Sequence, residues 1–164
     1  MRLVVADTGP INYLVLVDAI NLLPKLFNTI FVPAAVYREL CHPGAPLPVR
    51  AWIASIPNWL EVRPNPDYKS NDPAEMALDN GERAAIALAA AINADLIFID
   101  DRAGARSRTG AASTVTGTLG VLDLGARRGL IDLARAFERL RATNFRYRPE
   151  IMDALLAQHR EEKT

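Results

Sequence analysis

The strongest constraint on the fold of this chain is an alternation of short apolar runs with helical segments. Runs at 3–6, 29–32, 59–62 and 95–99 have the length and composition of buried strands, and a brief further run lies around Thr114-Val115. Strands separated by helices form βαβ units, which assemble into a mainly parallel sheet covered by helices. We therefore predict an α/β fold, a three-layer α/β/α domain with a sheet of four to five strands.

The helices between and after these runs are also predicted by local signals. Pro10, Pro33 and Pro149 stand near the first turns of expected helices, where the missing N–H of proline is tolerated. The alanine-rich segment 82–92 indicates a long helix that lies close against the sheet. Helix starts are also expected at Asp72-Pro73 and, rich in arginine, after Asp101. The pattern predicts one domain over 1–164, with a core at about 1–130 and C-terminal helices at about 131–161.

Composition restricts the class of protein further. Half of the 164 residues are hydrophobic and 23% are charged, which is ordinary for one globular domain. No segment is apolar for long enough to cross a bilayer, and Asp7 and Pro10 interrupt the stretch where the apolar region of a signal peptide would continue. The single cysteine, Cys41, excludes an internal disulfide and fits a reducing compartment. We expect a cytoplasmic protein that does not associate with membranes.

The net charge of zero conceals an asymmetry along the chain. Residues 1–100 hold 7 lysines and arginines against 11 acids, and residues 101–164 hold 12 against 8. The basic half could attract polyanions and the acidic half could hold cations, or both could be solvated surface charge. The charge pattern permits nucleic-acid binding without establishing it.

Acidic residues follow two of the predicted strands directly. Asp7 ends the first strand and Asp100-Asp101 end the fourth. In parallel α/β sheets, ligands bind beyond the carboxyl ends of the strands, where the strand order switches. Glu39, late in the helix after the second strand, and Glu82, in the first turn of the helix before the fourth, can reach the same end of the sheet. The sequence predicts a cluster of carboxylates there.

Each acid also has a plainer interpretation. Asp7 could cap the helix near Pro10, and one of Asp100-Asp101 could cap the helix that follows them. Glu39 could be a solvated acid on a helix surface. Glu82 stands three residues after Asp79, which is the spacing of a capping box. The shared position of the acids, rather than any single one, favours a functional site.

Carboxylates crowded together repel one another and need a cation. Oxygen ligands suit Mg²⁺ or Mn²⁺, and neither His42 nor His159 has a partner at the spacing of a zinc site. Cys41 has no histidine placed to activate it as a nucleophile. A hydrated Mg²⁺ would be completed by phosphate oxygens of a substrate, so the pattern indicates phosphoester chemistry.

Five motifs together resemble the PIN-domain family, and they are most similar to its branch of VapC-type toxins. The motifs are Asp7-Thr8-Gly9-Pro10, Val32-Pro33 with Glu39-Leu40, Asp79-Asn80-Gly81-Glu82 with the alanine-rich helix, Ile99-Asp100-Asp101, and the segment 116–122. Each motif is weak alone, but their order and spacing are fairly specific.

The resemblance implies a Mg²⁺- or Mn²⁺-dependent endoribonuclease, commonly a homodimer held inactive by a small antitoxin protein. It implies catalytic acids at Asp7, Glu39, Glu82 and Asp101. Asp7, Glu82 and Asp101 would bind metal, with Asp100 as the ambiguous neighbour, and Thr8 would contact metal or phosphate. One ion held by Asp7, Glu82 and Asp101 would orient the attacking water, and a second near Glu39 would stabilise the leaving oxygen.

The segment after Asp101 departs from the family pattern. Gly104 and Gly110 each cost roughly 1 kcal/mol against alanine within a helix, so the helix there is expected to be short. Arg102, Arg106 and Arg108 would then reach the phosphates of RNA, or would be exposed arginines that aid solubility.

Three alternatives remain open at this level. A haloacid-dehalogenase-like phosphatase needs a second acid where Gly9 stands, so it is disfavoured. A catalytically silent module that binds RNA or protein and an RNA-processing nuclease without an antitoxin are both compatible with the sequence.

Overall fold

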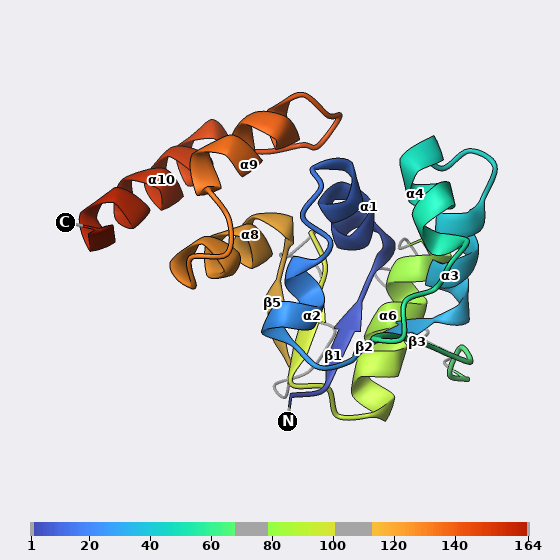
Figure 1. The fold of residues 1–164 in the computed structure, drawn as a ribbon. Helices are drawn as coiled ribbons and strands as arrows, with labels where there is room; N and C mark the ends of the chain where they lie inside the picture. Colours follow the sequence, from blue (N-terminus) through green and yellow to red (C-terminus); the bar gives the residue numbers. More distant parts are fainter. Residues whose placement is uncertain (1, 68–78, 101–112, 164) are drawn as a thin grey trace.

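The protein has a parallel β-sheet enclosed by helices (Figure 1). A computed structural model describes residues 2–67, 79–100 and 113–163. The sheet has five strands in the described residues, in the order β3-β2-β1-β4-β5, and every neighbouring pair is parallel. The strands are β1 (Val4–Ala6), β2 (Ile30–Pro33), β3 (Leu60–Arg63), β4 (Leu96–Phe98) and β5 (Thr114–Thr116). The predicted fold class is confirmed.

The helices occur where the sequence patterns place them. In the described residues they are α1 (Thr8–Leu16), α2 (Leu22–Leu26), α3 (Ala34–Cys41), α4 (Leu47–Ile53), α6 (Asn80–Ala91), α8 (Thr118–Arg127), α9 (Leu133–Arg141) and α10 (Pro149–Lys163). The helix starts predicted at Asp72-Pro73 and after Asp101 lie outside the described residues.

The two faces of the sheet bury two different sets of side chains. Successive side chains of a strand point to opposite faces, so Val4 and Ala6 enter one apolar cluster and Val5 enters the other. The first cluster includes residues of α1, α2, α8 and α9. The second is formed with Ala85, Ile86, Leu88 and Ala89 of α6. The sheet is thus the middle layer of three.

The strand order reverses at β1. The chain passes from β1 to β2 and β3 on one side, then returns to place β4 on the other side of β1. The backbone N–H of Asp7, just beyond β1, donates to the carbonyl of Phe98 at the end of β4 (2.9 Å). The residues that follow β1 and β4 therefore meet at the point where an α/β sheet opens a crevice.

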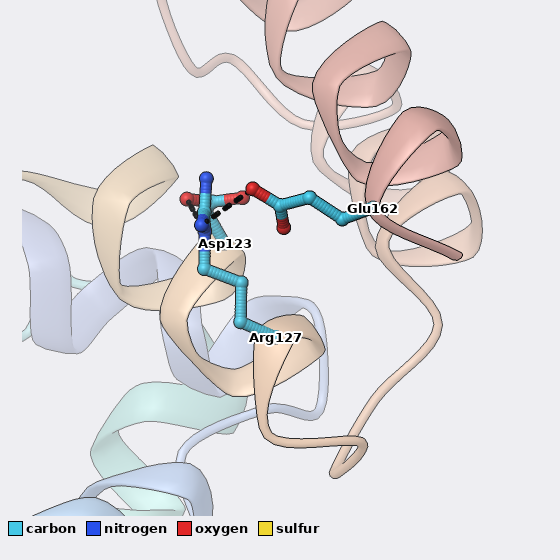
Figure 2. Close-up of polar contacts among 3 residues, drawn as sticks. All are labelled: Asp123, Arg127 and Glu162. Atoms are coloured by element: carbon cyan, nitrogen blue, oxygen red, sulfur yellow. Dashed lines mark hydrogen bonds and ion pairs between the residues drawn. The ribbon is translucent and has the colours of Figure 1, made fainter. Parts of the chain in front are cut away.

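The last three helices pack together, α9 and α10 on α8 (Figure 1), and all three contribute to the first apolar cluster. Arg127 of α8 donates to Asp123 and to Glu162 near the end of α10, each at 2.9 Å (Figure 2). The buried side chain of Met152 anchors α10 in the first apolar cluster. No helix in the described ranges is long and apolar enough to cross a membrane.

Candidate active site

A cleft of about 460 Å³ opens at the carboxyl ends of β1 and β4. Its lining comes from the start of α1, from α3, from the start of α6, from the end of β4 and from the connection between α9 and α10. The acids that line it are Asp7, Glu39, Asp79, Glu82 and Asp100. Segments that are far apart in the chain therefore bring carboxylates to one place, as the sequence predicted.

Asp7 is the most deeply placed of these acids. Its residue is only 6% exposed, and its Oδ1 atom is buried without a hydrogen-bond partner among the described residues. Burial raises the pKa of this carboxyl well above its ordinary value; the backbone N–H of Thr8 lowers it in part, and the charges of Asp79, Glu82 and Glu39 raise it further. Asp7 therefore sits in a site that disfavours its own negative charge unless a positive charge is bound nearby.

Glu39 is held against α1 and α6 and is not a freely solvated helix acid. Its Oε2 atom accepts a hydrogen bond from the Thr8 hydroxyl, and its Oε1 atom accepts one from the backbone N–H of Gly81 (3.1 Å). A Cβ atom at position 81 would lie 2.6 Å from Oε1, which is closer than a Cβ atom approaches a non-bonded neighbour. Because Gly81 has no side chain, it leaves the space that the Glu39 carboxylate occupies.

Asp100 is oriented by α8. Its Oδ1 atom accepts the backbone N–H of Thr118 (2.7 Å), and its Oδ2 atom accepts the Thr118 hydroxyl (3.0 Å). A Cβ at Gly117 would lie 2.6 Å from Oδ1, so this glycine also leaves room for a carboxylate. Asp100 therefore accepts the hydrogen bonds of the first residue of α8 and caps this helix. The sequence had instead indicated a cap for the helix directly after Asp100-Asp101.

Asp79 and Glu82 bring two further acids to the first turn of α6. The Asp79 side chain accepts the backbone N–H of Glu82 (2.7 Å), which is the capping bond that their spacing predicted. The acid that caps the helix also lines the cleft. The capping interpretation is therefore correct for this pair, and the capping bond does not keep the two acids out of the cleft.

The far wall of the cleft comes from the connection between α9 and α10, which the sequence analysis did not place there. Asn144, Phe145 and Arg146 line the cleft together with Tyr13 of α1. The Tyr13 hydroxyl donates to Asn144 Oδ1 (2.9 Å), and the rings of Tyr13 and Phe145 meet edge to face with centroids 4.9 Å apart. Burial and the charge of Asp100 raise the pKa of Tyr13 while Arg146 opposes the rise. Arg146 is the basic side chain among the described residues of the lining.

The structure thus gathers all five of the predicted site residues that it describes. Asp7, Thr8, Glu39, Glu82 and Asp100 share the cleft. The prediction of Asp101 as a metal ligand, and of three arginines as substrate contacts (Arg102, Arg106 and Arg108), falls outside the described residues. Asp7 stands at the N-cap position of α1, but its side chain makes no capping hydrogen bond there, so the capping alternative does not account for its buried carboxyl.

Comparison with known proteins agrees with this arrangement. The family model described as a PIN domain matches residues 3–161, which is nearly the whole chain. The chain belongs to the PIN-domain family. Members of this family are generally nucleases, so membership indicates a nuclease. No curated protein and no solved structure matched the chain.

The ligand atoms in the cleft of this PIN domain are oxygens, which suit a hard divalent cation. The cleft offers carboxylate oxygens, and the buried Oδ1 atom of Asp7 has no protein donor among the described residues. Within that same part of the chain, no three histidine, cysteine or acidic side chains already converge on one ion position. Glu39 and Asp100 are turned toward protein donors, so binding an ion would require carboxylates of the cleft to turn inward.

Proposed function

We propose that this PIN domain is a metal-dependent endoribonuclease that hydrolyses phosphodiester bonds in the acidic cleft. The observation that supports it most is the buried Oδ1 atom of Asp7, which has no hydrogen-bond partner in the described part of the chain and lies in a cleft with four other acids, at the switch point of the sheet. Carboxylates gathered in this way destabilise one another unless a cation compensates them. RNA as the substrate follows from the resemblance of the motifs to ribonucleases of the family.

Asp7, Glu82 and Asp101 would hold Mg²⁺ or Mn²⁺, with Asp100 or Glu39 completing the set. The ion would supply Lewis acidity and an acidified water for attack on phosphorus. Glu39 is kept in place by Thr8 and Gly81, which preorganises one side of the cleft. Arg146 faces the carboxylates from the opposite segment, where its guanidinium would hold a phosphate of the strand.

The test is cleavage of labelled single-stranded RNA, single-stranded DNA and double-stranded RNA, each with Mn²⁺ and with a chelator. Asp7→Asn and Asp101→Asn are compared with Asp18→Asn, which makes the same chemical change at an exposed acid outside the cleft. Asn tolerates the positive φ of residue 18, so this control should fold normally.

We expect Mn²⁺-dependent cleavage of RNA by the wild type and by Asp18→Asn, and a loss of at least about a hundredfold in Asp7→Asn and Asp101→Asn. Cleavage that survives chelation and both substitutions would end the proposed mechanism. Metal binding without cleavage of any substrate would instead identify a catalytically silent binding module.

For the cellular role we propose a toxin of a toxin–antitoxin pair, a homodimer neutralised by a small antitoxin protein, on the strength of the motif resemblance. Induced expression in a bacterial host should arrest growth with the wild type and not with Asp7→Asn. Growth unaffected by an RNA-cleaving wild type would favour the RNA-processing nuclease.

A further inference from the structure

A second and larger cavity adjoins the acidic cleft. It has a volume of about 810 Å³, within the range of ligand sites, and lies between α3 and α6. These two helices are packed side by side (Figure 1). Thr8 and Glu39 line both this cavity and the acidic cleft. A ligand that leaves the cleft past these two side chains therefore enters the cavity.

Two arginines face this cavity without a carboxylate partner among the described residues. Arg38 of α3 donates only a long bond to the carbonyl of Ala34 (3.4 Å). Arg83 of α6 donates from Nη2 to Asn80 Oδ1 (2.6 Å), while its Nε atom is buried and has no partner in the described part of the chain. A buried guanidinium donor left unpaired is costly, and an anionic ligand would satisfy it.

The remaining walls suit the uncharged part of a nucleotide. Small apolar side chains, among them Ala84 and Ala87 of α6 and Pro46 and Pro66, stand beside the arginines. No Phe, Tyr or Trp occurs among the lining residues that the structure describes, so the His42 ring is the aromatic surface there on which a base could stack. The cavity therefore combines phosphate recognition with room for a ribose and base.

We propose that this cavity binds the nucleotide next to the scissile phosphate, with Arg83 and Arg38 on its backbone phosphate. The inference rests on the proposed nuclease function and deepens it, since it gives the single strand a path from the acidic cleft between α3 and α6. Because the contacts are to phosphate, the subsite strengthens binding of any single-stranded RNA with little preference for sequence.

The test measures binding of a fluorescein-labelled hexauridylate by anisotropy, over a range of KCl concentrations. It uses the Asp7→Asn protein with Mg²⁺, and a gel confirms that the probe stays intact. Arg83→Met is added to this background and should weaken binding about tenfold, because a charge-assisted contact is lost. The slope of log affinity against log salt should fall by about 0.7, the value for one phosphate contact on a single strand.

Three companion variants make the result specific. Arg135→Met removes an exposed arginine on α9, outside both cavities, and should leave affinity within about twofold, as expected for a distant surface charge. Ala84→Phe fills the cavity without changing charge and should weaken binding as Arg83→Met does. Thermal melts of each variant confirm folding, and Arg83→Lys should restore part of the affinity.

The outcomes separate this inference from the proposed function. If the wild type cleaves RNA but Arg83→Met and Ala84→Phe change neither affinity nor KM, the subsite is wrong and the nuclease stands. If Arg83→Met weakens binding but no substrate is cleaved with Mn²⁺, the subsite stands and the nuclease proposal fails. If uridine monophosphate alone binds as tightly as the hexamer, and this binding depends on Arg83, the cavity is a site for free nucleotides and the strand path is wrong.

Discussion

The cleft imposes an electrostatic cost on the carboxyl of Asp7. This carboxyl is buried beside three other acids, and burial first, then their charges, raises its pKa. A group whose pKa is raised on folding stabilises the fold while it is protonated, and this contribution is lost as pH rises through the folded-state pKa. In the metal-free protein near neutral pH, Asp7 therefore opposes folding.

We expect Asp7→Asn to melt roughly 3–8 °C above the wild type in a chelator at about pH 7, the shift of a stabilisation near 1–2 kcal/mol. The gap should narrow toward about pH 4, where an ordinary aspartate is half protonated. Added Mn²⁺ should raise the melting temperature of the wild type more than that of the variant. Differential scanning fluorimetry measures all three quantities. An Asp7→Asn protein less stable than the wild type in chelator at neutral pH would contradict the burial argument.

At the residue scale, the acids at the ends of elements were predictable and the far wall of the cleft was not. Asp7 follows β1 directly and Asp100 stands two residues after β4, and that position indicates a site in a parallel sheet. Arg146 and Asn144 reach the cleft only because Phe145 packs against Tyr13, more than 130 positions earlier in the chain. Nothing local in the sequence encodes that contact.

At the scale of elements, the junction of α3 with α6 depends on one glycine. Gly81 leaves room for the Glu39 carboxylate and donates its backbone N–H to it. The glycine in the Asp79-Asn80-Gly81-Glu82 motif is thus explained by a helix–helix contact. Its presence was visible in the sequence, but its physical reason required the position of α3.

Gly81→Ala should separate helix stability from site geometry. Alanine is the better helix former by up to about 1 kcal/mol, yet its Cβ would displace Glu39. We expect kcat/KM for RNA to fall at least about tenfold, since small displacements of positioning groups are costly. Ala90→Gly, on the exposed face of the same helix, should lower the melting temperature and leave kcat/KM unchanged. A Gly81→Ala enzyme of wild-type activity would show that the Glu39 position is not important.

At the scale of the whole molecule, the parallel sheet and its helices were predicted because each βαβ unit carries its own periodicity. The packing of α9 and α10 on α8 was not, because it depends on contacts between distant segments. Apolar side chains of all three helices enter the first cluster, Met152 of α10 among them. Two polar contacts flank α10: Arg146, just before it, lines the cleft, and Glu162 near its end pairs with Arg127 of α8 (Figure 2).

The two ends of α10 should differ in their effect on catalysis. Arg127→Met breaks ion pairs that are partly exposed and that lie outside the cleft, so the melting temperature should fall modestly while activity remains unchanged. Arg146→Met removes the cation that faces the acids and should lower kcat/KM about tenfold, with a salt dependence flatter by about 0.7. Steady-state cleavage of one RNA at several salt concentrations distinguishes the two variants. Equal losses in both would mean that α10 acts only by stabilising the fold, and an Arg146→Met enzyme with full activity would remove this arginine from the substrate path.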